Sequence, residues 1–202
     1  MTSKTTPSDR LKYAFVTVGA SASFKLLIEE VLSAPFLAKL NSLGFSHLII
    51  QCGPDYDYFL SSEPRLHPSD SNALLVVGFP YHDDIREYMG LTTASDTSDA
   101  IKRDRGLIIT HAGSGSILEA LDFDSALIAV PNPTLMDNHQ SEIAEEMERQ
   151  GHLIQGKIGS LIDIINEDTL TAPKKQWPPD PDPESEWPGG LWDIIRTLIY
   201  EQ

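Results

Sequence analysis

The sequence contains few of the residues and segments on which several classes of protein depend. Cys52 is the only cysteine among 202 residues, so an internal disulfide is excluded and the composition suits a reducing compartment. The six histidines show no zinc-ligand spacing, and neither a metal nor another cofactor is predicted. No run of about 18 apolar residues occurs, so no membrane-spanning helix is predicted.

Basic residues are scarce as well. The chain has 15 lysines and arginines against 30 aspartates and glutamates, which gives a formal net charge of -15. This charge argues against a nucleic-acid partner and against direct binding to an anionic membrane. The first eleven residues are polar and lack the apolar core of a signal peptide, so we expect a cytoplasmic protein.

Two common nucleotide-binding motifs are missing. The first strand-to-helix loop has Gly19 followed by Ala20 and Ser21, where a dinucleotide-binding oxidoreductase would have Gly-x-Gly-x-x-Gly. No Gly-Lys-Ser/Thr sequence occurs, so a P-loop phosphotransferase is also disfavoured.

Short apolar runs alternate with segments of helical spacing along most of the chain. This alternation predicts a Rossmann-like α/β fold, an open parallel sheet with helices on both faces. Strands are expected over residues 13–18, 47–51, 73–78, 107–110 and 125–130, and a last strand and helix within 152–165. The polar stretches 53–72 and 90–100 are expected to be loops with little regular structure.

Composition divides the chain into four segments. Residues 1–11 form a polar tail, and 12–170 are long enough for one domain with a core. Prolines and acids dominate 171–190, which is typical of an extended linker. Apolar spacings of three and four predict an amphipathic helix over 191–202, docked either on its own domain or on a partner.

The stretch from Leu107 to Glu119 carries the strongest functional signal. A buried strand ends in His111, and small residues follow before a helix begins. Such a turn exposes backbone N–H groups at a helix N-terminus, where a phosphate binds favourably. Glu119 is three residues beyond Ser116, and its carboxylate can accept hydrogen bonds from ribose hydroxyls. The alternative is an ordinary turn capped by Ser114 or Ser116, with Glu119 interacting with the helix dipole.

A second loop of the same kind follows the next strand. Residues 125–130 end at Pro131, and polar side chains at 137–140 come just before another helix. Loops after parallel strands meet at the carboxyl edge of the sheet, where ligands bind. Amide, imidazole and carboxylate groups pair with sugar hydroxyls, so the two loops together indicate a nucleotide-sugar site. Asp137 could instead cap the helix.

These two motifs resemble the donor half of GT-B glycosyltransferases, of the glycosyltransferase family 28 C-terminal domain type. The resemblance rests on His111-Ala-Gly-Ser-Gly-Ser116 with Glu119, and on Asp137-Asn-His-Gln140. It extends over residues 12–165. Within this type the chain is similar to the small donor-binding subunits of eukaryotic dolichol-linked UDP-N-acetylglucosamine (UDP-GlcNAc) transferases, which are related to the bacterial peptidoglycan lipid-intermediate enzyme.

The resemblance implies a role for each matching position. His111 would assist the leaving diphosphate, Glu119 would bind ribose, and the loop after the first strand would approach the diphosphate. That loop departs from the family, since Ala20-Ser21-Ala22-Ser23 stands where relatives often carry two threonines. The implied substrate-binding residues are Gly19, Ser21, Phe79 and Pro80 (near uracil, with core packing of Phe79 as the alternative), His111, Gly113, Ser114, Gly115, Ser116, Glu119, and Asn138, His139 and Gln140 (on the sugar).

The implied activity is inverting transfer of a second N-acetylglucosamine onto GlcNAc-diphosphodolichol, in the pathway to protein N-glycosylation. A membrane-anchored partner would supply the acceptor half and recruit the chain to the cytosolic face of the endoplasmic reticulum. No catalytic base is identified in this chain, and the partner could provide it. The competing interpretation is a non-catalytic UDP-sugar-binding regulatory subunit.

Overall fold

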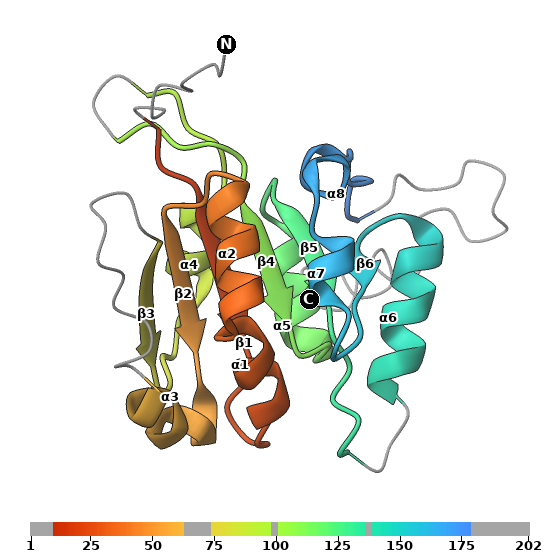
Figure 1. Ribbon diagram of the computed structural model, residues 1–202. Coiled ribbons are helices and arrows are strands. Elements are labelled where there is room, and N and C mark those ends of the chain that lie inside the picture. The colour runs from red at the N-terminus through yellow and green to blue at the C-terminus, as the bar shows by residue number, and fades with distance from the viewer. Residues whose placement is uncertain (1–9, 63–73, 98–100, 136–138, 179–202) are drawn as a thin grey trace, which may run out of the picture.

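The computed structural model describes residues 10–62, 74–97, 101–135 and 139–178 (Figure 1). Six parallel strands form one open sheet in the order β3-β2-β1-β4-β5-β6. The strands are β1 (Tyr13–Thr17), β2 (His47–Gln51), β3 (Leu75–Phe79), β4 (Leu107–Thr110), β5 (Ala126–Ala129) and β6 (Ile154–Gln155).

The strand order puts the functional loops at one place. β1 pairs with both β2 and β4, so the chain proceeds outward from β1 in one direction and later from β4 in the other. The loops after these two strands therefore leave toward opposite faces and open a crevice at the carboxyl edge, the lower edge in Figure 1. β4 and β5 are buried at every position, as near-continuous apolar runs in a parallel sheet require.

Helices cover both faces of the sheet, which confirms the predicted fold class. One face of β1, with Ala14 and Val16, packs in one apolar cluster, and Phe15 on the opposite face packs in a second. The helices are α1 (Lys25–Val31), α2 (Ala34–Ser42), η1 (a 3-10 turn, Gly53–Asp55), α3 (Tyr56–Ser62), α4 (Arg86–Leu91), α5 (Ser114–Leu121), α6 (His139–Gln150), α7 (Leu161–Ile164) and α8 (Glu167–Thr171).

The prediction of two irregular loops was wrong in part. The polar stretch after β2 begins with η1 and α3, because Phe59 of α3 is buried against β3, next to Gly78. A β-carbon on Gly78 would lie 2.6 Å from the Phe59 ring, so the helix packs tightly on β3. In the other stretch Thr92 is fully buried and Ser95 pairs with Arg103.

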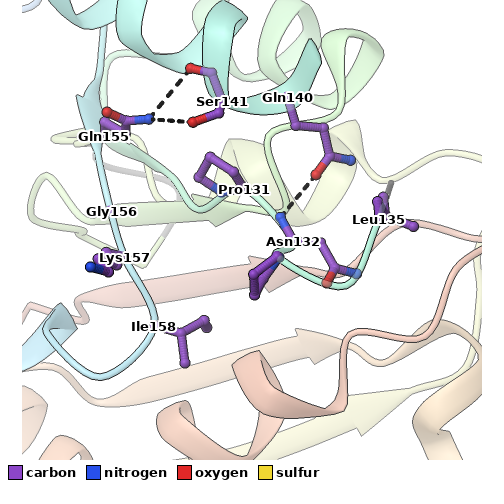
Figure 2. A pocket seen from close by; sticks show the side chains of 10 residues that line it. Pro131, Asn132, Leu135, Gln140, Ser141, Gln155, Gly156, Lys157 and Ile158 are labelled. Carbon is purple, nitrogen blue, oxygen red and sulfur yellow. Dashed lines mark hydrogen bonds between the residues drawn. The ribbon is translucent and has the colours of Figure 1, made fainter. Parts of the chain in front are cut away.

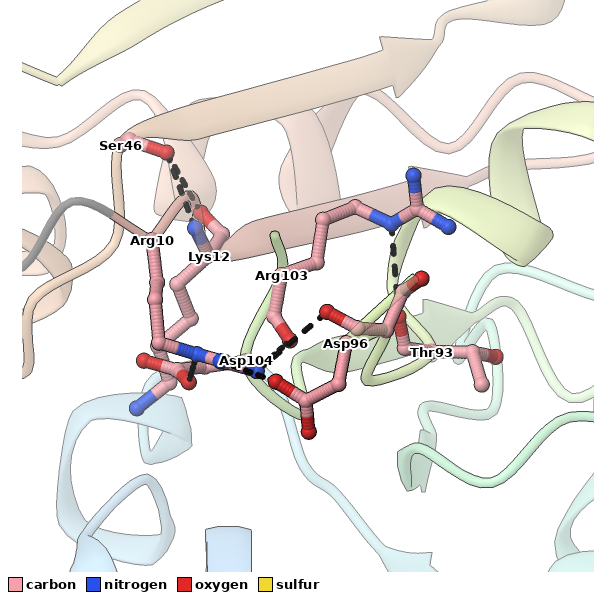
Figure 3. A network of polar contacts seen from close by, with 8 residues as sticks. Arg10, Lys12, Ser46, Thr93, Asp96, Arg103 and Asp104 are labelled. Carbon is pink, nitrogen blue, oxygen red and sulfur yellow. Dashed lines mark hydrogen bonds and ion pairs between the residues drawn. The ribbon is translucent and has the colours of Figure 1, made fainter. Parts of the chain in front are cut away.

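Arg10 ties the start of the described chain to the amino edge of the sheet (Figure 3). Its guanidinium pairs with Asp96 and Asp104 and donates to the carbonyl oxygen of Arg103 at 2.7 Å. Leu11 forms a parallel bridge with Arg103. The last two residues of the predicted tail are therefore held against the domain.

Past α8 the chain continues along the domain surface. Lys174 donates to the carbonyl oxygens of Ala120 and Leu121, at 3.3 and 3.2 Å, and so caps the C-terminus of α5. Trp177 packs edge-on against His152, with ring centroids 5.2 Å apart. Packing thus extends beyond residue 170, where the linker was predicted to begin. The remaining linker and the predicted helix over 191–202 lie outside the described residues.

Candidate functional site at the carboxyl edge

The ring of His111 lies between two glycines from neighbouring loops. A β-carbon on Gly19 would lie 2.7 Å from the ring atom Cε1, and one on Gly113 would lie 2.4 Å from Nε2. Gly19 also has a φ of 80°, a conformation that favours glycine. The main chain fixes this arrangement, since the His111 amide donates to the Thr17 carbonyl oxygen at 3.0 Å. Gly19, His111 and Gly113 are thus brought together at the carboxyl edge of the sheet.

The turn from β4 into α5 leaves the first backbone N–H groups of the helix without a side-chain cap. Ala112 is fully buried with a φ of 60°, a conformation that costs a non-glycine residue on the order of 1 kcal/mol. Gly113 is the N-cap residue and no side chain accepts from the helix there. The alternative in which Ser114 or Ser116 caps this turn is therefore wrong. The free N–H groups remain available to an anion.

Glu119 lies in the second turn of α5, because the helix already begins at Ser114. The first turn contains no acidic residue, and the dipole falls off within that turn. The alternative that Glu119 interacts with the helix dipole therefore has little physical basis. Its side chain is half-buried on the same helix whose N-terminus faces the crevice.

Burial sets the charge state of His111. It lowers the pKa of the imidazole below its usual value, and the Thr17 backbone opposes this to a smaller extent. The ring is therefore neutral at pH 7. Among the described residues Nδ1 is buried without a hydrogen-bond partner. A neutral imidazole can donate one N–H and accept one hydrogen bond.

The loop after β5 bonds to Gln140, one of the sugar-side candidates (Figure 2), and also to the loop after β1. Gln140 is half-buried in the first turn of α6, and its Oε1 accepts from the Asn132 amide at 2.9 Å. The Asn132 side chain donates through Nδ2 to the Ser23 carbonyl oxygen, also at 2.9 Å. His139 is exposed, with Nδ1 3.8 Å from a Glu142 carboxylate oxygen. Asn138 and Asp137 lie outside the described residues.

A pocket of about 550 Å³ opens beside Gln140, between the loops after β5 and β6. Polar and apolar groups both line it (Figure 2). The lining residues are Pro131, Asn132, Pro133, Leu135, Gln140, Ser141, Gln155, Gly156, Lys157 and Ile158. This combination suits a ligand with hydroxyl and amide groups and an apolar face.

The residues predicted to lie near the uracil are further along the carboxyl edge of the sheet. Phe79 ends β3, which is separated from β1 by β2, a lateral distance of about 10 Å. Its ring is half-buried and stacks on Tyr88, with centroids 4.6 Å apart. Pro80 and Ser21 are exposed. Both interpretations of Phe79 remain compatible with this position.

Two residues that hold the loop after β1 were not predicted from the sequence. Asp55 of η1 accepts from the Ser23 hydroxyl and from the Phe24 amide, both at 2.7 Å. Asn132 binds the other side of the same loop and is only 6% exposed. The available signal was an asparagine between two prolines directly after a buried strand.

In the part of the chain that the structure describes, no three histidine, cysteine, aspartate or glutamate side chains gather as metal ligands would. No helix among the same residues is long and apolar enough to span a membrane.

An open parallel sheet with an uncapped helix N-terminus at its switch point defines a Rossmann-like nucleotide-binding domain. Its strand order and helix arrangement match those of GT-B glycosyltransferase C-terminal halves. Acinetobacter baumannii MurG shares this fold, with a TM-score of 0.53 and 20% identity over 80% of this chain and 43% of MurG. A solution structure of ALG13 aligns with a TM-score of 0.53 and 25% identity, over 96% of this chain and 97% of that one.

The glycosyltransferase family 28 C-terminal domain model matches residues 13–175, and the chain belongs to this family. Its relatives include proteins named UDP-N-acetylglucosamine transferase subunit ALG13. The Candida glabrata relative is 35% identical over 70% of this chain and 78% of its own length, and the Saccharomyces cerevisiae relative is 33% identical over 70% of this chain and 76% of its own length. The human relative is 37% identical over 71% of this chain, which spans 11% of that longer protein.

Proposed function

We propose that this chain is the donor-binding subunit of an inverting N-acetylglucosaminyltransferase that adds the second sugar to GlcNAc-diphosphodolichol. The observation that carries the proposal is the contact of His111 with Gly19 and Gly113, beside the uncapped N-terminus of α5. Relatives named as UDP-N-acetylglucosamine transferase subunits support the choice of donor.

The site supplies what departure of a diphosphate requires. In the transfer, an acceptor hydroxyl oxygen bonds to the anomeric carbon while the bond from that carbon to the β-phosphate oxygen breaks. UDP leaves with the electron pair, and the hydroxyl proton passes to a base. Negative charge grows on the diphosphate, where the N–H groups of α5 and a neutral His111 can donate hydrogen bonds. These donors act without a metal ion.

The remaining candidates take the rest of the donor. Glu119 accepts from the ribose hydroxyls, and Phe79 with Pro80 borders the uracil. Gln140 contacts the N-acetylglucosamine together with Asn138 and His139. The pocket beside Gln140 is large enough for a hexosamine and presents both amide groups and apolar surface.

A partner completes the enzyme in this proposal. The relatives are named as subunits, which supports a heteromer. We infer a membrane-anchored partner that binds the lipid acceptor, contributes the base and holds the chain at the cytosolic face of the endoplasmic reticulum.

The test is transfer from labelled UDP-GlcNAc to lipid-linked GlcNAc by the chain with and without such a partner. We expect activity only in the pair, lost with Glu119→Ala and Gln140→Ala. Glu145→Ala is the matched control, because Glu145 is exposed on α6 away from these contacts. Full transfer by both variants would contradict the proposal, and normal activity with lost UDP-GlcNAc binding would favour the regulatory alternative.

A further inference from the structure

Asn132 is buried, and its four polar backbone and side-chain groups are all used. Its amide donates to Gln140, and Nδ2 donates to the Ser23 carbonyl oxygen. Oδ1 accepts from the Thr134 amide at 3.1 Å and from its hydroxyl at 2.8 Å. Its own carbonyl oxygen accepts from Leu135 at 3.3 Å. Such full use is typical of a polar side chain that fixes local structure.

The neighbours of Asn132 restrict its main chain. Pro131 and Pro133 each have a fixed φ, and a residue before proline is confined to extended conformations. The main chain of Asn132 is thus fixed at little further cost in conformational entropy, and the bonds to Ser23 and Thr134 hold its carboxamide. A side chain held in this way fixes the position of the group to which it is hydrogen-bonded.

The side chain of Asn132 binds the loop after β1, which lies on the diphosphate side of the proposed site. Ser23 belongs to the loop after β1, which also contains Gly19 next to the His111 ring. Asp55 holds Ser23 from one side and Asn132 holds it from the other. Ser23 and Asn132 are 109 residues apart, so no local structure replaces this bond.

We propose that Asn132 is a positioning residue that keeps the diphosphate-side loop in register with Gln140 on the sugar side. The inference rests on the proposed function, since it assigns Gln140 to the sugar and the Gly19 loop to the diphosphate. A sugar nucleotide spans both loops, whereas UDP alone occupies one side. Losing Asn132 should therefore weaken the sugar nucleotide more than UDP.

Two substitutions separate the contributions. Asn132→Leu keeps the approximate shape and removes all three side-chain hydrogen bonds, one to Ser23 and two to Thr134, without adding charge. Asn132→Asp keeps an acceptor for Thr134 and places a carboxylate oxygen against the Ser23 carbonyl oxygen. Asn166→Leu is the matched control, because Asn166 makes a comparable bond to Thr169 at 2.9 Å, at the N-terminus of α8 on the opposite edge of the sheet.

The first readout is steady-state kinetics of the reconstituted pair. We expect both Asn132 variants to raise the KM for UDP-GlcNAc about tenfold, the effect of losing the one buried hydrogen bond to Ser23 that both variants remove. The inhibition constant of UDP should change much less. The Asn166 control should lower the melting temperature while leaving both constants unchanged. Equal changes in the two constants, or none, would overturn the inference.

The second readout needs no donor. Amide hydrogen exchange across residues 19–24 should accelerate in Asn132→Leu and stay at the wild-type rate in the control. Faster exchange in a pair that transfers no sugar would sink the proposed function and leave the loop coupling intact. Unchanged exchange would refute the role of Asn132 whatever the activity.

Discussion

Gly113→Ala is the most direct probe of how His111 is held. The backbone of Gly113 has φ -68° and ψ 134°, which any residue can adopt, so the substitution adds no dihedral strain. The new β-carbon would lie 2.4 Å from Nε2 of His111 and 2.9 Å from Cε1. The loss of stability therefore comes from displacing the His111 ring.

The size of the effect follows from that contact. The ring must retreat by about 1 Å to restore a normal van der Waals separation. Gly19 blocks one direction, because the ring already lies against its backbone. Overpacking of this kind costs about 1–3 kcal/mol. For a chain of this length the loss corresponds to a fall in Tm of about 2–12 °C.

The assay is a double-mutant cycle measured by urea unfolding and calorimetry. In a His111→Ala background the space left by the ring accommodates the new methyl group, so Gly113→Ala should cost little there. We expect a coupling free energy of about 1–2 kcal/mol between the two positions. Gly115→Ala is the control, since its β-carbon would meet nothing within 4 Å and alanine favours the helix.

An equal cost of Gly113→Ala in both backgrounds would refute this reasoning, because the penalty would then come from the N-cap and not from the ring. A destabilising Gly115→Ala would show that any substitution in this turn is harmful, which would remove the meaning of the comparison.

Three further outcomes are expected. Burial raises the pKa of the Cys52 thiol to about 12, so an aromatic disulfide reagent should react with it only on unfolding. Burial lowers the pKa of His111 below 6.5, so the unfolded chain takes up this proton first and stability should fall as the pH drops through about 6.5. His47 acts in the same direction, so the test is whether His111→Gln reduces the pH dependence of the urea midpoint. Glu30 accepts from the Gly159 amide at 2.8 Å, and Glu30→Ala should speed exchange of that amide; an unchanged rate would contradict the bond.

The strands and the motif-bearing loops were predictable because strands buried in a parallel sheet appear in the sequence as short apolar runs. The predicted range for β2 is exact, and β4 and β5 coincide with the two apolar runs that precede the functional motifs. The small residues after His111 were informative for the same reason: a ring held this closely leaves no room for a β-carbon at Gly113.

The features that were not predicted depend on contacts between residues far apart in the sequence, which the local residue pattern does not reveal. The stretch after β2 begins with proline and acids, which is typical of a loop, yet Phe59 anchors a helix there by packing against a strand further along the chain. The strand order does not follow from alternation alone. No role was predicted for Asn132 from the sequence, and only its bond to Ser23 reveals what it holds.

The central position of β1 has a consequence for synthesis of the chain. Ala14 pairs with Leu107, and a ribosome adds about 5–20 residues per second, so roughly 5–20 s separate the synthesis of these two residues. During that interval the strand made first has no partner on one side, although Phe15 and Val16 are fully buried in the finished sheet. An unpaired apolar strand edge recruits other chains. The nascent N-terminal half therefore exposes an unpaired apolar strand edge until β4 has left the ribosome.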